Sequence, residues 1–243
     1  MTIVFLPGIL IGKDCFAPTE KIFIDAGYKT YIHSFPGFDG RARLSNDTPT
    51  PEEYADDLYL KVNGLGKLHL YAHCSGCTPA IMFSIKYPGL VASLTLISYW
   101  HGTKEWESRL AIIDEGVEAY ALNRIGKLIG SDNSGTISRV VGWIKSAITD
   151  FEGFFQMARS INKYSAKELL PLIKAPVQFI IGSRDKITLP EAQIAVAKKY
   201  TDSITIIPEG SHCMFFEDPI TPASETIKFI KEVSSLKHKG EIL

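Results

Sequence analysis

The chain has 243 residues, 45% of them hydrophobic, which is enough to bury a large core within a single domain. Its formal net charge of −1 gives no electrostatic case for nucleic acid or an anionic membrane as a partner. No apolar run approaches the roughly 20 residues of a membrane span, and the first residues lack the basic start and cleavage site of a signal peptide. We therefore expect a cytoplasmic protein whose four cysteines stay mostly reduced.

Short apolar and β-branched runs alternate with longer amphipathic stretches, which is the pattern of parallel strands joined by helices. The sequence predicts six strands at residues 2–6, 29–33, 67–71, 94–97, 177–182 and 204–207. Helices are predicted up to Gly27, from Pro51, directly after the third strand, and over about 219–233. The predicted fold class is therefore α/β, with a mainly parallel sheet of about six strands flanked by helices.

One long stretch interrupts this alternation between the fourth and fifth strands. Residues 102–172 show no strand pattern, and helical spacing dominates, as in the series Ile137, Val141, Ile144 and Ile148. Ligands of open parallel sheets bind at the carboxyl ends of the strands. We therefore predict a core formed by 1–101 and 173–243, with 102–172 inserted as a helical lid over that edge.

The segment from Leu68 to Cys77 is the most informative for chemistry. A strand leads into a turn in which Cys74 has Ala72 two residues before it and Gly76 two residues after it. Small residues at these positions allow the central residue a strained backbone and expose its side chain at the start of a helix. The free N–H groups of that helix would stabilise a thiolate. On its own, however, a free cysteine is more often a buried structural thiol.

Ser75 is the competing centre of this turn. Centring the turn on Ser75 would put His73 at a position that requires a small residue, so the steric argument favours Cys74.

Two further candidates follow the last two predicted strands. Asp185 comes directly after the fifth strand in Ser183-Arg184-Asp185, and His212 follows the sixth strand. Taken singly, Asp185 could cap a loop and His212 could lie on the surface. Because the carboxyl ends of parallel strands share one edge, we expect both to lie near Cys74. The sequence thus predicts a nucleophile, Cys74, a general base, His212, and a carboxylate, Asp185, that orients the histidine.

An oxyanion hole is predicted beside the nucleophile. The turn after the first strand, Pro7-Gly8, places the Ile9 amide at the same edge, and the Ser75 amide follows Cys74 directly. Two fixed N–H donors of this kind stabilise the oxyanion of a tetrahedral intermediate. Pro7-Gly8 would also serve as a simple tight turn.

These segments resemble the α/β-hydrolase superfamily over nearly the whole chain. Residues 36–40 resemble its second-strand turn, 181–185 its acid-bearing turn and 210–212 its histidine loop. The first strand corresponds to what is usually the third strand of that fold, so the resemblance implies a reduced sheet. Residues 98–116 and 151–154 resemble the lid region of 3-oxoadipate enol-lactone hydrolases.

The chain departs from that subgroup at the nucleophile. The subgroup carries serine at the position of Cys74 and glycine at the positions of Ala72 and Cys77, whereas dienelactone hydrolases of the same fold carry a cysteine nucleophile. The resemblance therefore implies hydrolysis of an acyl bond, and a cysteine suits activated acyl groups such as thioesters, enol lactones and esters.

The expected partner is a small-molecule acyl substrate, either free or carrier-bound, with no cofactor and no metal. Aromatic and polar side chains around the predicted lid would bind it: Trp100, His101, Trp106, Phe154 and Phe215. The sequence identifies neither the substrate nor the oligomeric state.

Other functions remain open at this point. A cysteine acyl-enzyme could pass its acyl group to an amine, alcohol or thiol, which would make the protein an acyltransferase. A binding protein that kept the fold without turnover is a second alternative. Cys74 and Cys77 also form a C-x-x-C pair, as in thioredoxin-like redox proteins or a regulatory disulfide. A metal site of Cys74, Cys77, His212 and Cys213 has suitable ligands but lacks a paired motif.

Overall fold

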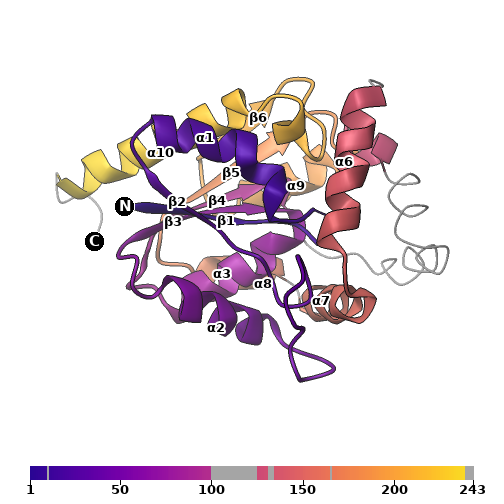
Figure 1. Ribbon diagram of the computed structural model, residues 1–243. Coiled ribbons are helices and arrows are strands. Elements are labelled where there is room, and N and C mark those ends of the chain that lie inside the picture. The colour runs from indigo at the N-terminus through magenta and orange to yellow at the C-terminus, as the bar shows by residue number, and fades with distance from the viewer. Residues whose placement is uncertain (10, 100–124, 131–133, 165, 239–243) are drawn as a thin grey trace.

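The computed structural model describes residues 1–9, 11–99, 125–130, 134–164 and 166–238. Six parallel strands form one sheet in the order β2-β1-β3-β4-β5-β6 (Figure 1). Their bounds are Thr2–Leu6 (β1), Lys29–Ile32 (β2), Leu68–His73 (β3), Val91–Ile97 (β4), Val177–Gly182 (β5) and Ile204–Ile207 (β6). All six predicted strands are confirmed, and β1, β5 and β6 have the predicted ends. The central strands β1, β3 and β4 are buried along their whole length, which explains their near-continuous apolar sequences.

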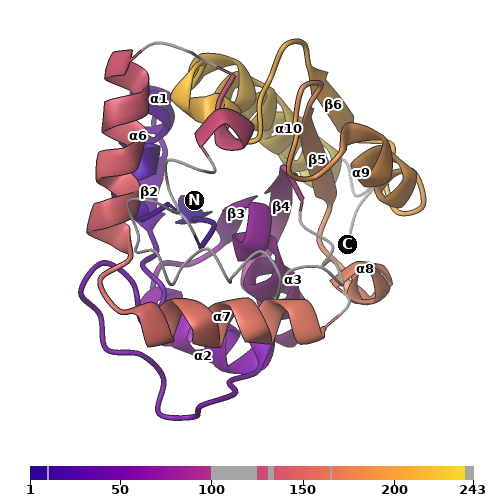
Figure 2. The ribbon, with the colours of Figure 1, turned by 90° about the vertical axis from the view of Figure 1, so that its right-hand side faces the viewer.

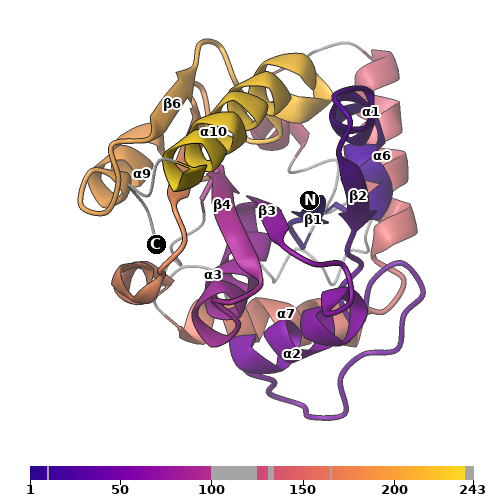
Figure 3. The same ribbon diagram turned by 90° about the vertical axis from the view of Figure 1, so that its left-hand side faces the viewer.

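Helices cover both faces of the sheet. Helices α1 (Ala17–Asp25) and α10 (Ile220–His238) lie on one face, and α2 (Pro51–Val62) and α3 (Cys77–Lys86) lie on the other (Figures 1 and 3). Helix α9 (Pro190–Ala197) follows β5. Helix α2 starts at Pro51 as predicted, because Thr50 and Glu53 form a reciprocal capping box around its first turn. Helix α10 runs further than the predicted 219–233.

The described part of 102–172 is helical. It includes α6 (Ser134–Ala147), α7 (Phe151–Lys163), α8 (Ala166–Leu169) and a 3-10 turn at Leu170–Leu172. Helices α6 and α7 lie beyond the end of the sheet toward which the strands run (Figures 1 and 2). The predicted helical spacing is confirmed in α6, which buries Val141 and Ile144.

The inserted helices share their hydrophobic core with the sheet. Buried side chains of α6 and α7 belong to the same cluster as those of the strands. Backbones also meet closely: a Cβ on Gly37 would lie 2.6 Å from the Cα of Gly153 in α7. The carbonyl of Ala147, at the end of α6, accepts the Asp39 N–H at 3.0 Å. Among the described helices, none is both long enough and apolar enough to cross a membrane.

Candidate active site

Cys74 lies in a strained turn at the end of β3. The chain passes from His73 directly into the 3-10 turn Cys74–Gly76 and then into α3. Cys74 has a φ of +50°, a region that side-chain-bearing residues rarely adopt. Gly76 has no room for a side chain, because a Cβ there would lie 2.5 Å from the carbonyl oxygen of Pro7. The turn therefore holds Cys74, which is half-buried, against the loop after β1.

The chain brings Asp185 and His212 together at the same edge. Asp185 follows the end of β5 and His212 lies in the loop after β6, as expected for the ends of neighbouring parallel strands. The Nδ1–H of His212 donates to Asp185, with 2.9 Å to Oδ2 and 3.1 Å to Oδ1. Asp185 is 2% exposed and His212 is 1% exposed, so the pair is shielded from water.

The electrostatics of this pair favour a charged imidazole. Burial opposes the charge, but the Asp185 carboxylate and the hydrogen-bonded Cys74 outweigh it and raise the pKa of His212 to about 10. Burial also opposes ionisation of Asp185, but His212 and hydrogen bonds from Thr188 lower the pKa of that carboxyl to about 2.

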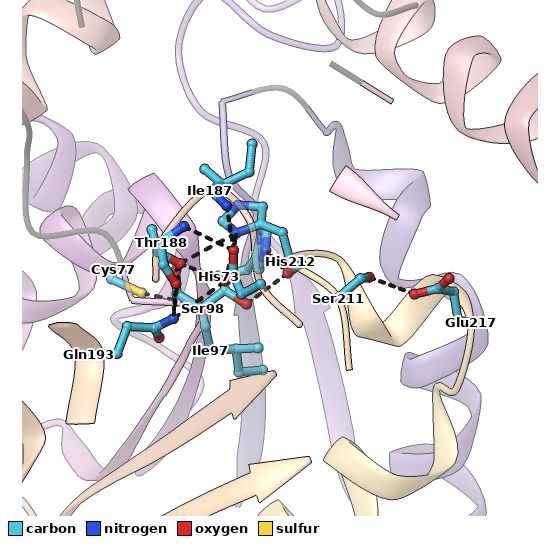
Figure 4. Close-up of polar contacts among 11 residues, drawn as sticks. His73, Cys77, Ile97, Ser98, Ile187, Thr188, Gln193, Ser211, His212 and Glu217 are labelled. Atoms are coloured by element: carbon cyan, nitrogen blue, oxygen red, sulfur yellow. Dashed lines mark hydrogen bonds and ion pairs between the residues drawn. The ribbon is translucent and has the colours of Figure 1, made fainter. Parts of the chain in front are cut away.

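The Asp185 carboxylate has partners that sequence reasoning missed. Its Oδ1 accepts the backbone N–H groups of Ile187 at 2.8 Å and Thr188 at 2.9 Å. Its Oδ2 accepts the Thr188 hydroxyl at 2.6 Å and Nε2–H of Gln193 at 3.4 Å (Figure 4 labels Thr188 and Gln193). The Asp-x-x-Thr spacing is a turn signal that could have indicated Thr188. No sequence signal indicated Gln193, which reaches the site from α9.

The backbone of His212 is fixed by two further side chains. Its carbonyl oxygen accepts the Ser98 hydroxyl at 2.7 Å and the His73 Nε2–H at 3.0 Å (Figure 4). Burial and the charge of His212 lower the pKa of His73 to about 3, so His73 stays neutral beside a charged His212. Ser98 has a φ of +48°, which sequence reasoning did not anticipate. The hydrogen bond that His73 donates is to the backbone of His212 and not to its ring.

The predicted oxyanion donors lie next to each other, but in an arrangement the sequence did not suggest. The Ile9 N–H donates to the side-chain oxygen of Ser75 at 2.8 Å. Ser75 is 2% exposed, so this contact is inside the protein.

Two of the five predicted substrate-binding residues lie in the described part of the chain, and both are buried. Trp100, His101 and Trp106 lie outside the described residues. Phe154 is buried in α7, where its ring lies 5.7 Å from that of Phe155. Phe215 is also buried, with its ring 4.9 Å from that of His73 and 4.8 Å from that of Phe16. Contact between any of these side chains and a substrate stays a prediction.

The remaining cysteines are buried thiols. Cys77 is not bonded to Cys74, and its thiol donates to the Ala72 carbonyl at 3.4 Å (Figure 4 shows Cys77). Burial raises the pKa of Cys213 and of Cys15. Within the described ranges, no group of three or more His, Cys, Asp or Glu side chains could hold a metal ion. The alternative metal set of Cys74, Cys77, His212 and Cys213 is therefore not assembled as a site.

Comparison with known proteins supports the same fold. An uncharacterized protein of Mycobacterium tuberculosis is 27% identical over 194 residues, which are 66% of this chain and 54% of the relative. The chain thus spans about half the length of the curated relatives that it matches. A thermophilic esterase of Thermogutta terrifontis superposes with a TM-score of 0.85 and 22% identity, over 96% of this chain and 90% of the esterase.

An enol-lactonase of Burkholderia xenovorans superposes with a TM-score of 0.82 and 16% identity, over 95% of this chain and 91% of the lactonase. The model of the alpha/beta hydrolase family matches residues 3–223. With the parallel sheet, the strained turn after β3 and the Asp–His pair after β5 and β6, the chain belongs to the alpha/beta hydrolase family.

Proposed function

We propose that this protein is a hydrolase that cleaves an activated acyl bond through an acyl-enzyme on Cys74. His212 is the general base and acid, and Asp185 holds the imidazole in place. The observation that carries the proposal is the buried His212–Asp185 hydrogen bond of 2.9 Å, with Cys74 as the other group that stabilises the charged imidazole.

The backbone supports Cys74 as the nucleophile over its neighbour. The positive φ of Cys74 is the strained conformation that a nucleophile needs at a strand-to-helix turn. Ser75 is buried and its oxygen already accepts the Ile9 N–H. A structural thiol would have no need of a strained backbone, whereas a nucleophile must be held above the strand ends.

The reaction has two halves. The proton of Cys74 already lies on Nε2 of the charged His212 when the sulfur adds to the acyl carbon, and the carbonyl electron pair moves to oxygen. When the tetrahedral intermediate collapses, the bond to the leaving group breaks and that group takes the proton from His212. Water then adds to the thioester and gives a proton to His212, and collapse of this second intermediate releases the acid and the Cys74 sulfur, with His212 charged again. Throughout, the Asp185 carboxylate keeps Nδ1 protonated and Nε2 directed at the reacting atoms.

The substrate class follows from the nucleophile. A cysteine nucleophile suits an acyl group with a good leaving group, so thioesters, enol lactones and activated esters are the expected substrates. The structural likeness to an esterase and to an enol-lactonase supports this class. We also propose that 102–172 acts as a lid over the site, since α6 and α7 lie beyond the carboxyl ends of the strands (Figure 2).

Intact-protein mass spectrometry after brief exposure to acyl thioesters, enol esters and lactones tests the proposal. Wild type is compared with Cys74→Ala, with Cys77→Ala as the control that removes a neighbouring thiol. We expect a transient acyl adduct on wild type and on Cys77→Ala, none on Cys74→Ala, and release of free acid. An adduct stable in water that discharges onto an added amine or thiol would instead indicate an acyltransferase. No adduct on folded wild type with any donor would contradict the nucleophile and favour a binding protein.

A further inference from the structure

The single hydrogen of the Ile9 amide already takes part in a hydrogen bond within the protein. It points at the Ser75 side-chain oxygen, 2.8 Å from the amide nitrogen. An N–H donates one good hydrogen bond, so an amide in this arrangement does not also point directly at a substrate oxygen. Of the two backbone N–H groups predicted to bind the oxyanion, the one of Ile9 is therefore not directed at it.

The Ser75 hydroxyl lies beside the nucleophile. A Cβ placed on Gly8 would be 3.2 Å from Cβ of Cys74 and 3.5 Å from the Ser75 oxygen, so both side chains border the same small space over the loop after β1. Ser75 is 2% exposed, and among the described residues its hydroxyl is recorded only as an acceptor. A buried hydroxyl whose proton has no acceptor is a group ready to donate to one.

We propose that the Ser75 hydroxyl is a catalytic group that donates a hydrogen bond to the substrate oxyanion. It forms the middle of a hydrogen-bond relay that runs from the Ile9 amide to the substrate oxygen. The Ile9 N–H donates to the Ser75 oxygen, and the Ser75 O–H donates to the substrate oxygen alongside the Ser75 backbone N–H. This inference rests on the proposed function, because it assigns the oxyanion that forms when Cys74 adds to an acyl carbon.

Such a relay stabilises charge selectively. A hydroxyl that accepts a hydrogen bond becomes a stronger donor, because the two bonds polarise each other. Its bond to a developing oxyanion is charge-assisted and so stronger than a bond to the neutral carbonyl of the bound substrate. The relay therefore acts in the transition state more than in substrate binding, and its loss lowers kcat more than it raises KM.

Two reactions of the same thiol separate this role from a structural one. Acylation of Cys74 by an acyl thioester passes through an oxyanion, whereas alkylation by iodoacetamide does not. Both rates are measured in wild type, Ser75→Ala and Ser75→Thr, with circular dichroism to show that each variant is folded. We expect Ser75→Ala to lose about tenfold or more in acylation, with an unchanged alkylation rate and KM, and Ser75→Thr to recover most of the loss.

The outcomes are distinct. Acylation of Ser75→Ala at the wild-type rate or faster would overturn the relay, because the freed Ile9 N–H would then serve the oxyanion directly. Parallel loss of acylation and alkylation would also overturn it, since the hydroxyl would then act on the thiol or the fold. If wild-type Cys74 is alkylated but accepts no acyl donor, the proposed hydrolase function fails, and the relay fails with it.

Discussion

The carboxylate of Asp185 is the negative charge that stabilises the charged form of His212. It accepts hydrogen bonds from Ile187, Thr188, Gln193 and His212. Replacing it by asparagine removes the charge that raises the pKa of His212 and leaves the burial that lowers it. In Asp185→Asn we therefore expect the pKa of His212 to fall well below about 10, with Cys74 as the remaining group that raises it, and acylation of Cys74 to slow by about three orders of magnitude.

An NMR titration of the His212 ring and single-turnover acylation measure the two effects. Asp202→Asn is the matched control, because Asp202 is an exposed carboxylate in the turn before β6. A His212 pKa that stays near 10 in Asp185→Asn would contradict the assignment of Asp185 as its stabilising charge.

The same pair makes stability depend on pH in a defined window. Asp185 has a folded pKa of about 2 against an ordinary 3.8, so its contribution is present above 3.8 and is lost as the pH falls toward 2. His212 has a folded pKa of about 10 against an ordinary 6.5, so its contribution is full below 6.5 and is lost as the pH rises toward 10. Because both shifts describe one ion pair, its stabilisation is largest between pH 3.8 and 6.5.

Urea unfolding of wild type and Asp185→Asn across pH measures this window. We expect the difference in the free energy of unfolding to be greatest within it and to shrink at both ends. A difference that does not vary with pH would mean that Asp185 acts by packing alone.

At this scale, the sequence predicted the three residues of the proposed triad but not the side chains that hold them in place. Cys74, Asp185 and His212 could be found because each follows a strand with a readable apolar pattern. The contacts of Ser98 and His73 with the His212 carbonyl could not, since they join residues 114 and 139 positions apart in the chain. The Ser75–Ile9 contact was missed for the same reason, since the two residues are 66 positions apart in the chain.

Helix α7 meets the loop after β2 through two glycines. A Cβ on Gly153 would lie 2.5 Å from the Cα of Gly37, and backbone atoms on both sides leave little room to relax. We therefore expect Gly153→Ala to lower the free energy of unfolding by roughly 1–3 kcal/mol. Urea denaturation of wild type and Gly153→Ala measures this difference in the free energy of unfolding.

Gly142 provides a matched control in α6. It is also helical, but a Cβ there meets nothing within 4 Å. Gly142→Ala should raise stability by up to about 1 kcal/mol, because alanine favours the helix. Equal effects of the two substitutions would show that the Gly37–Gly153 contact is not a tight one.

The segment 125–130 is joined to the loop that carries His212. The Cys213 N–H donates to the Leu128 carbonyl at 2.8 Å, and Glu217 accepts both the Gly130 N–H at 2.8 Å and the Ser211 hydroxyl at 2.5 Å (Figure 4 shows Ser211 and Glu217). Loss of these Glu217 bonds in Glu217→Ala should loosen the loop by about 1 kcal/mol per hydrogen bond.

Hydrogen–deuterium exchange measures that loosening as roughly five- to thirtyfold faster exchange over 211–216. Glu232→Ala, on the exposed side of α10, is the control. Unchanged exchange in Glu217→Ala would mean that the other contacts of the loop suffice.

The ends of helices and strands were predicted correctly where the residues at those ends differ clearly in type from the residues inside the element. The ends of β1, β5 and β6 were predicted because β-branched runs stop at proline, glycine or polar residues. Strand β4 begins at Val91, earlier than the predicted 94, because Ala92 and Ser93 have low strand propensity and only pairing with β3 makes them extended. Helix α10 exceeded its prediction because its last turns are polar and carry little hydrophobic pattern.

In the molecule as a whole, the sheet and the inserted helices share one core. Side chains of α6 and α7 pack in the same cluster as those of β1 to β5. Ala147 at the end of α6 also lies against Gly12, because a Cβ on Gly12 would be 2.6 Å from the Ala147 Cβ. We therefore expect the insertion and the sheet to unfold in one transition. In a variant that keeps Trp143 of α6 as its only tryptophan, fluorescence and far-ultraviolet circular dichroism should give the same urea midpoint. An earlier fluorescence transition would show that the insertion melts independently.

The strand order also bears on how the protein is made. After β2 and β1 pair, β3 joins the free side of β1, and β4, β5 and β6 then add to the same growing edge in the order of synthesis. A nascent chain on the ribosome can thus extend its sheet one strand at a time without inserting a late strand between early ones. Cys74 is in place with β3, but Asp185 arrives with β5 and His212 only after β6. If the proposed mechanism holds, the emerging chain therefore carries its nucleophile without a base until β6 and the loop that bears His212 have been made.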